Sequence, residues 1–232
     1  METTRLNKYI SEAGICSRRA ADKLIEEGKV LIDGVVAGVG DKVGEGQVVT
    51  INGQVINPDT EKVVLAYNKP IGIECTADKT NKDNIIDAVN YPKRVVNVGR
   101  LDKNSCGLIF LTNDGELENI ITKADRKHDK EYFVRINRPV TDEFVKKMEA
   151  GVTLDDGVTT RPCKLYKKGE KSFNIVLTQG INRQIRRMCK ACGANVTFLQ
   201  RIRIMTINLG NLKPGEYREL SKAEVKSLYD RA

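Results

Sequence analysis

Hydrophobic positions follow helical spacing at the start of the chain, which has 232 residues. Leu6, Ile10 and Ala13 recur at the interval expected of the buried face of a helix. Ser17 has a side chain that commonly caps a helix N-terminus, and the pattern after it predicts a second helix over residues 18–27. The chain therefore opens with two short amphipathic helices.

Two β-hairpins are predicted after these helices. Short runs of Val, Leu and Ile flank Asp33-Gly34, and further runs flank Asn52-Gly53. Both dipeptides favour the left-handed backbone of a two-residue hairpin turn. We therefore interpret residues 1–57 as a small domain and residues 58–62 as a linker that contains a turn.

The remaining residues, 63–232, predict a larger domain that mixes strands and helices without regular alternation. Apolar runs or alternating patterns of strand length occur at residues 63–67, 95–98, 108–111, 130–136, 164–166, 173–177, 196–199, 201–209 and 217–220. Helices are predicted at residues 84–89, 115–123, 141–151 and 182–189, and residues 221–224 form a capping box before a last helix. This order predicts an α+β fold with a mixed, mainly antiparallel sheet.

A polar loop lies between two of these apolar runs, at residues 95–98 and 108–111. Asp102 is near the apex of the loop. A loop that strands fix at both ends is a common position for a catalytic group. Most loop aspartates are solvated or cap nearby backbone, so the position alone makes Asp102 only a candidate.

The distribution of charge predicts a polyanionic partner. The chain has a net charge of +8 and a pI of about 9.1. Residues 1–60 have seven Lys or Arg and nine Asp or Glu, so the remaining residues carry a net charge of +10. No acidic residue lies between Glu170 and Glu216, which favours contact with a phosphate backbone over an ordinary solvated face. The basic residues of this acid-free stretch are Lys171, Arg183, Arg186, Arg187, Lys190, Arg201, Arg203 and Lys213.

The cysteines do not form a metal-binding pattern. There are six, and the pair Cys189 and Cys192 lacks the second pair or nearby histidine that a structural zinc site needs. His128 is the only histidine of the chain and is interpreted as a surface or packing residue. Neither a signal peptide nor an apolar run of membrane-spanning length is found. We expect reduced thiols, no metal and a cytoplasmic protein.

Three motifs resemble those of RsuA/RluB/RluF-type pseudouridine synthases. They are Gly99-Arg100-Leu101-Asp102 with the apolar run after it, Lys130-Glu131-Tyr132, and Gly180-Ile181-Asn182-Arg183-Gln184-Ile185-Arg186-Arg187-Met188. Asn68-Lys69-Pro70 also matches the opening motif of this family, and the residues around the second and third motifs are most similar to the RluF branch. The combination spans most of the chain in the order that the family has.

The first domain resembles the S4 RNA-binding domain. The resemblance covers most of residues 4–53 and includes Arg5-Leu6-Asn7-Lys8-Tyr9-Ile10 and Ser17-Arg18-Arg19-Ala20-Ala21. It implies that the helix pair binds structured RNA, mainly through phosphate contacts. The residues implied in this binding are Arg5, Lys8, Ser17, Arg18, Arg19 and Lys29.

The resemblance implies isomerisation of uridine to pseudouridine. The N1–C1′ bond breaks, the base rotates and a C5–C1′ bond forms, so no cofactor is required. Asp102 is implied as the carboxylate that attacks C1′ or takes a ribose proton, and both routes stay open. Arg186 is implied as its bidentate partner and Tyr132 as the ring that stacks on the base. The residues implied in holding the RNA are Arg100, Asn182, Arg183 and Arg187.

The implied substrate is a structured stem-loop in 23S ribosomal RNA, and the RluF branch adds the anticodon stem-loop of tyrosine tRNA. A monomer is expected. A non-enzymatic RNA-binding or ribosome-assembly protein would share the S4 domain and the basic stretch, but would not need Asp102 together with Arg186. An S4-linked methyltransferase would need a glycine-rich nucleotide loop after a strand, and the sequence has none.

Overall fold

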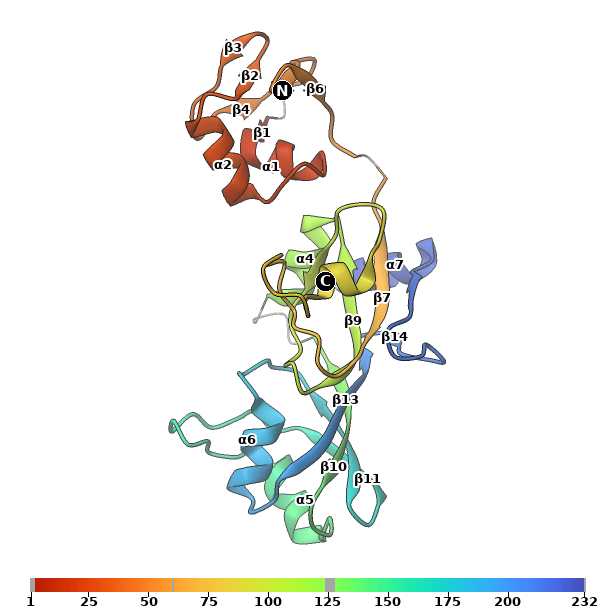
Figure 1. Ribbon diagram of the computed structural model, residues 1–232. Coiled ribbons are helices and arrows are strands. Elements are labelled where there is room, and N and C mark those ends of the chain that lie inside the picture. The colour runs from red at the N-terminus through yellow and green to blue at the C-terminus, as the bar shows by residue number, and fades with distance from the viewer. Residues whose placement is uncertain (1–2, 60, 124–127, 232) are drawn as a thin grey trace. The chain divides into compact units, whose positions relative to one another are not determined.

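The structure is a computed structural model that describes residues 3–59, 61–123 and 128–231 (Figure 1). The chain divides into two compact units. The first contains residues 1–62 with 92–94, and the second contains residues 63–91 with 95–232. Each unit has a separate hydrophobic core, so each holds its own elements in place.

The first unit packs two helices against a small antiparallel sheet of order β3-β2-β5-β6. The predicted hairpin turns are confirmed, because Asp33-Gly34 and Asn52-Gly53 all have positive φ. The Ser17 hydroxyl caps α2 by accepting a hydrogen bond from the Ala20 N–H at 3.2 Å. The pairing of β1 with β4 was not predicted, because two residues are too few to show a periodicity. The elements are β1 (Thr4–Arg5), α1 (Leu6–Glu12), α2 (Arg18–Glu26), β2 (Val30–Ile32), β3 (Val35–Val36), β4 (Lys42–Val43), β5 (Val49–Ile51) and β6 (Gln54–Ile56).

Strands of the described second unit form one mixed sheet of order β11-β12-β10-β13-β9-β7-β15, with β8 beside β9 and β14 beside β13. Its strands are β7 (Val64–Lys69), β8 (Val96–Val98), β9 (Cys106–Thr112), β10 (Lys130–Ile136), β11 (Lys164–Gly169), β12 (Ser172–Leu177), β13 (Val196–Ile204), β14 (Ile207–Asn208) and β15 (Tyr217–Glu219). Its helices are α3 (Ile85–Val89), α4 (Gly115–Thr122), α5 (Asp142–Glu149), α6 (Gln184–Ala191) and α7 (Lys222–Tyr229). The predicted α+β class and the capping box of α7 are confirmed.

The β7–β9 half of this sheet is covered on both faces. Side chains alternate between faces along a strand, so β7 and β9 supply two cores. One core contains Val64, Ala66, Leu108 and Phe110 with residues of α4 and α7. The other contains Leu65, Tyr67, Ile109 and Leu111 with residues of α3. Burial on both faces explains why these strands have nearly continuous apolar sequences.

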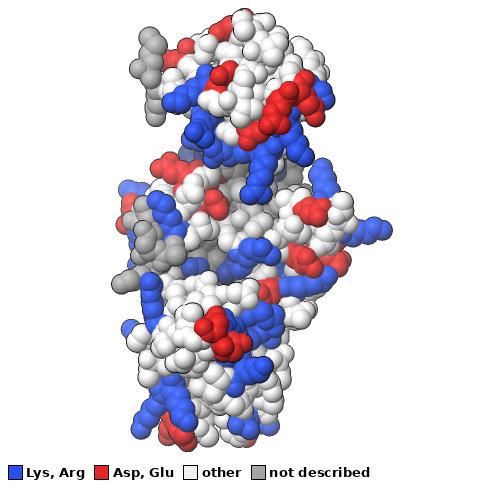
Figure 2. Space-filling model, turned by 90° about the vertical axis from the view of Figure 1, so that its left-hand side faces the viewer, with Lys and Arg blue, Asp and Glu red and all other residues white. Residues whose placement is uncertain are grey.

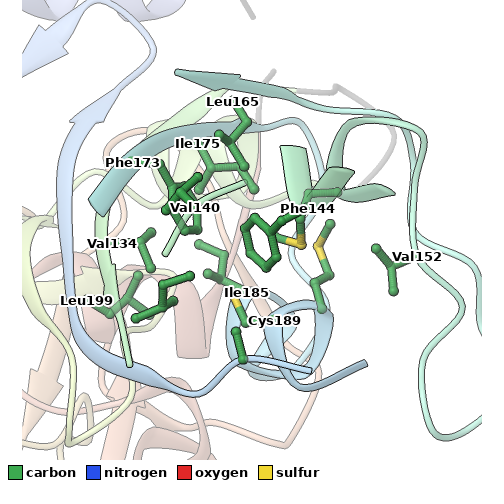
Figure 3. Close-up of a cluster of buried hydrophobic side chains, with 14 of the residues drawn as sticks. Val134, Val140, Phe144, Val152, Leu165, Phe173, Ile175, Ile185, Cys189 and Leu199 are labelled. Atoms are coloured by element: carbon green, nitrogen blue, oxygen red, sulfur yellow. The ribbon is translucent and has the colours of Figure 1, made fainter. Parts of the chain in front are cut away.

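The β10–β12 half packs against α5 and α6, which lie beside it in Figure 1. Phe173 and Phe144 are in contact at its centre, with ring centroids 5.7 Å apart. Figure 3 shows side chains from the strands and both helices converging on this cluster. Among its members are Val134, Val140, Phe144, Val152, Leu165, Phe173, Ile175, Ile185, Cys189 and Leu199. The cluster fixes α6, which begins at the third predicted motif.

The two halves of the sheet meet where β9 and β13 pair in parallel. Gln200 is opposite Cys106 and Arg201 is opposite Gly107. Gly107 has φ of +104°, and a Cβ atom there would lie 2.2 Å from the backbone oxygen of Arg201. Only glycine therefore allows the two backbones to approach this closely.

The separate strands predicted at residues 196–199 and 201–209 are wrong. Residues 196–204 form one strand, β13, whose pairing with β10 shifts register twice. Met205 then adopts a left-handed backbone with φ of 50°, and the chain turns back into β14. The sequence pattern did not reveal this turn because Met is not a typical turn residue. No helix of the described residues is long and apolar enough to cross a membrane.

The substitution Gly107→Ala tests the parallel junction. We expect it to lower the free energy of unfolding by about 2–4 kcal/mol, because the new methyl group must displace backbone rather than a flexible side chain. Gly115→Ala is the matched control, because no atom lies within 4 Å of its Cβ position and it begins α4. Chemical denaturation of both variants measures the difference. Equal stability of the two variants would contradict the steric role of Gly107.

Candidate active site

A cavity of about 730 Å³ lies in the second unit. Its walls come from the loop at residues 99–105, the segment at residues 177–185 and the strands β10 and β13. Tyr132 lines this cavity and packs against both the β10–β12 core and the core that contains α3. The cavity therefore forms where the two halves of the sheet join.

The loop that carries Asp102 is anchored on either side of this residue. The Leu101 N–H lies 3.2 Å from the Cys75 sulfur, to which it donates, and the Lys103 carbonyl accepts from the Gly72 N–H at 2.9 Å. The flanking strands β8 and β9 pair antiparallel, so the predicted strand–loop–strand arrangement is confirmed. These anchors hold the Asp102 side chain at the cavity wall, with 29% of its surface exposed.

Arg183 forms the ion pair of Asp102. Its Nη1 lies 3.6 Å from Asp102 Oδ2. The residue precedes α6 and has a left-handed backbone with φ of 50°, an uncommon conformation for a side chain of this size. The helix predicted from Asn182 therefore begins at Gln184, and the unusual backbone of Arg183 precedes its first turn.

Arg186 does not form the bidentate pair with Asp102 that the sequence suggested. Its Nη2 donates to the Asn104 carbonyl at 2.8 Å and to the Ser105 hydroxyl at 3.3 Å. Burial lowers the pKa of Arg186, and the positive charge of Arg183 lowers it further, whereas Asp102 opposes both effects. Arg186 thus supports the base of the loop and contributes its charge to the Asp102 site without a direct hydrogen bond.

A third cation, Lys69, is buried close enough to Asp102 to interact with its charge. Lys69 is fully buried at the end of β7, and its Nζ donates to the carbonyls of Pro70 and Ile73 at 2.8 and 2.7 Å. Burial lowers the pKa of Lys69, while the thiols of Cys75 and Cys106 and the carboxylate of Asp102 oppose this lowering. The sequence shows Lys69 only as part of a family motif, and its signal is a charged residue at the end of an apolar strand.

Several residues of the acid-free stretch are neutralised by acids from other segments. Arg187, which was implied in RNA binding, pairs with Asp155 and Asp156. Arg203 pairs with Asp129 at 2.7 Å and Glu131 at 3.1 Å, while Arg201 is buried. The interpretation of the whole stretch as a phosphate contact is therefore wrong. Arg100 and Asn182 are exposed and line the cavity together with Arg183.

The cations implied in RNA binding by the first unit are exposed. Lys8 lies 3.8 Å from Glu12, and Lys29 lies 2.6 Å from Glu27, whereas the Ser17 hydroxyl is used to cap α2. Figure 2 shows Lys and Arg side chains gathered along one side of this unit. The exposed basic residues of its helices and adjoining segments are Arg5, Lys8, Arg18, Arg19, Lys23 and Lys29.

The Cys189 and Cys192 pair shows no feature of a metal site in the part of the chain that the structure describes. Cys189 packs in the β10–β12 core, where burial raises the pKa of its thiol to about 12. No group of three or more described His, Cys, Asp or Glu residues is placed to hold a metal ion. His128 is buried, with Nε2 3.0 Å from the Ile120 carbonyl, as expected of a packing residue.

Comparison with known proteins identifies the class of this protein. Residues 63–191 match the family of RNA pseudouridylate synthases, and residues 4–49 match the S4 domain. The chain therefore belongs to the RNA pseudouridylate synthase family and has an S4 domain before the synthase domain. The prediction of an isomerase is confirmed over the non-enzymatic and methyltransferase alternatives.

Individual relatives narrow the comparison. The chain is 50% identical to the dual-specificity RNA pseudouridine synthase RluF of Salmonella typhi, over 98% of this chain and 79% of that protein. It is 38% identical to the ribosomal large subunit pseudouridine synthase B of Bacillus subtilis, over 97% and 95% of the two chains. A solved pseudouridylate synthase covers 97% of this chain and 99% of its own, with a TM-score of 0.71 and 29% identity.

The substitution Arg186→Ala tests how this side chain supports the loop. We expect faster hydrogen exchange of the backbone amides at residues 101–105, because the hydrogen bonds to Asn104 and Ser105 are lost. Arg187→Ala is the matched control, since the adjacent arginine pairs with Asp155 and Asp156 instead. Mass spectrometry of exchanged peptides measures both variants. Unchanged exchange of the loop in Arg186→Ala would show that Arg186 does not support it.

Proposed function

We propose that this enzyme isomerises a uridine of a structured RNA in the cavity beside Asp102. The observation that carries the proposal is an ion-paired carboxylate on an anchored loop, in the same cavity as Tyr132. An oriented carboxylate is the group that the reaction requires. The cavity volume of about 730 Å³ also suits a flipped nucleotide.

Each residue has a distinct role in this proposal. Asp102 attacks C1′ or takes a ribose proton, and Arg183 orients its carboxylate. Tyr132 stacks on the target base after the base has left its own stack. Arg186 supports the loop through its hydrogen bonds to Asn104 and Ser105. Arg100 contacts the RNA at the exposed part of the cavity. The redox state of the substrate does not change, so the proposed reaction uses no cofactor.

The proposed substrates are a stem-loop of 23S ribosomal RNA and the anticodon stem-loop of tyrosine tRNA. Support comes from the relatives, one named as a dual-specificity RNA pseudouridine synthase and another as a ribosomal large subunit pseudouridine synthase. In this proposal the enzyme is a cytoplasmic monomer. Its S4 domain binds the phosphates of a folded RNA through the exposed residues Arg5, Lys8, Arg18, Arg19 and Lys29, while Asn182 and Arg183 hold the RNA at the cavity.

The substitution Asp102→Asn tests the catalytic role. We expect pseudouridine formation to fall at least about 1000-fold, because the neutral amide can neither attack C1′ nor accept a proton, while RNA affinity is retained. Pseudouridine mapping of total RNA from cells with and without the protein first identifies the target uridine. Turnover of an RNA with that uridine then measures the variant.

Asp142→Asn is the matched control for this experiment. Asp142 is an exposed carboxylate that pairs with Lys167 and does not line the cavity. Its loss should leave turnover near that of the unmodified enzyme. Retained turnover by Asp102→Asn would remove Asp102 from the mechanism, whatever the substrate is.

Replacing Arg18 and Arg19 together by Ala tests the RNA contact of the S4 domain. We expect RNA affinity to fall about tenfold and the dependence of log affinity on log salt to lose about 2 units of slope, since two phosphate contacts are removed. The rate at saturating enzyme should persist. Lys79→Ala with Lys82→Ala removes the same charge from exposed residues outside the cavity. An equal loss of affinity in both double variants would point to net charge rather than to the S4 helix.

A further inference from the structure

Arg201 and Arg203 are two positions apart on β13, but only one of them has acidic partners in the described part of the chain. Arg203 is neutralised by Asp129 and Glu131. Arg201 is 3% exposed, lines the cavity and has no ion pair among the described residues. Its Nε donates to the Leu108 carbonyl at 2.6 Å, whereas its buried Nη2 has no hydrogen-bond partner in the part of the chain that the structure describes.

A β-bulge causes this difference. Residues two apart on a regular strand face the same side of a sheet. The pairing of β10 with β13 shifts register at this point, so that Glu131 is opposite Arg203 while the next residue, Tyr132, is opposite Arg201. The extra residue on β13 separates the two arginine side chains. As a result, Arg201 lies beside Tyr132 at the cavity, and Arg203 lies beside the carboxylates of Asp129 and Glu131.

Arg201 has no ion-pair partner among the described residues, and a second cation, Lys130, is close to it. Lys130 lies two residues before Tyr132 on β10, lines the same cavity and donates a hydrogen bond to the His128 carbonyl at 3.3 Å. Burial and the positive charge of Arg201 together lower the pKa of Lys130 to about 8, whereas the charge of Asp129 opposes this lowering. A buried cation without an anion or a full set of hydrogen bonds is unfavourable. These residues are therefore arranged to receive a negatively charged or strongly accepting ligand.

We propose that Arg201 is a catalytic residue that binds a carbonyl oxygen of the target uracil through its free Nη2. When the N1–C1′ bond breaks, its electron pair stays on the base and spreads over the uracil oxygens. The guanidinium stabilises this charge until the C5–C1′ bond forms, the C5 proton leaves and N1 gains a proton. The proposal rests on the proposed function, because it requires the uridine to react in the Asp102 cavity.

The position of Arg201 favours the base over the RNA backbone as its ligand. A phosphate of a folded RNA remains close to solvent, and the exposed residues Arg100 and Arg183 line the same cavity for such a contact. Arg201 is almost completely buried and is the cross-strand neighbour of Tyr132. A base that stacks against Tyr132 therefore lies next to Arg201. A hydrogen-bond donor stabilises developing negative charge most effectively where water is excluded.

The substitution Arg201→Met tests this role by kinetics. We expect the single-turnover rate at saturating enzyme to fall about 100-fold or more, while RNA affinity changes less than about threefold and its salt dependence is retained. Arg201→Lys should recover part of the rate, since it keeps the charge. Arg203→Met is the control, because it removes the same charge from the opposite face and should keep the rate of the unmodified enzyme. A normal rate in folded Arg201→Met, or a loss confined to affinity and salt slope, would overturn the proposal.

A measurement on the unmodified enzyme avoids any effect on folding. The side-chain resonances of ¹⁵N-labelled Arg201 are followed with an RNA that contains the mapped uridine, and with the same RNA made abasic at that position. Arg201→Lys assigns the signal. A shift only when the base is present supports the proposal. A shift with both RNAs identifies a phosphate ligand, and no shift with either shows that Arg201 is not in contact; both results overturn it. Turnover by Asp102→Asn would instead refute the proposed function.

Discussion

The close approach of β9 to β13 is the constraint on which the rest of the synthase domain depends. Gly107 has no side chain, so its backbone can lie against that of Arg201 in a parallel pair. This contact joins a half-sheet packed on α5 and α6 to one packed on α3, α4 and α7. The cavity lies beside this junction, and Tyr132, which lines it, packs against a core of each half.

The same junction determines the electrostatics of the site. Lys130 and Arg201 line the cavity and Lys69 is buried near it, while Arg183 pairs with Asp102 and Arg186 donates to the Asn104 carbonyl of the same loop. Asp102 is thus a carboxylate among several cations, and three of them, Lys69, Lys130 and Arg186, have pKa values lowered mainly by burial. Such an excess of buried positive charge is typical of a site that is completed by its ligand. An ion pair whose purpose was stability alone would not need the additional cations.

Much of the site could be predicted from the sequence, because its residues belong to motifs with a fixed order. Asp102 and Tyr132 line one cavity although they are 30 positions apart in the sequence. The partner of Asp102 was not predictable in the same way. Arg183, Arg186 and Arg187 are nearly adjacent in sequence, and only the left-handed backbone at Arg183 and the depth of α6 in its core decide which guanidinium reaches the carboxylate. The acids that neutralise Arg187 and Arg203 come from other segments, so the acid-free sequence could not indicate them.

The sequence by itself determined the structural features that depend only on residues adjacent in the chain. Side-chain size, local hydrogen bonding and the spacing of hydrophobic residues are enough to predict three kinds of feature. These are the hairpin turns at Asp33-Gly34 and Asn52-Gly53, the helix caps at Ser17 and Ser221, and the loop between β8 and β9. Only the tertiary structure decided which side of the sheet each arginine of β13 faces. One extra residue in a bulge reverses that side, and no local pattern of hydrophobic residues records it, because a bulge is defined by the strand that lies opposite.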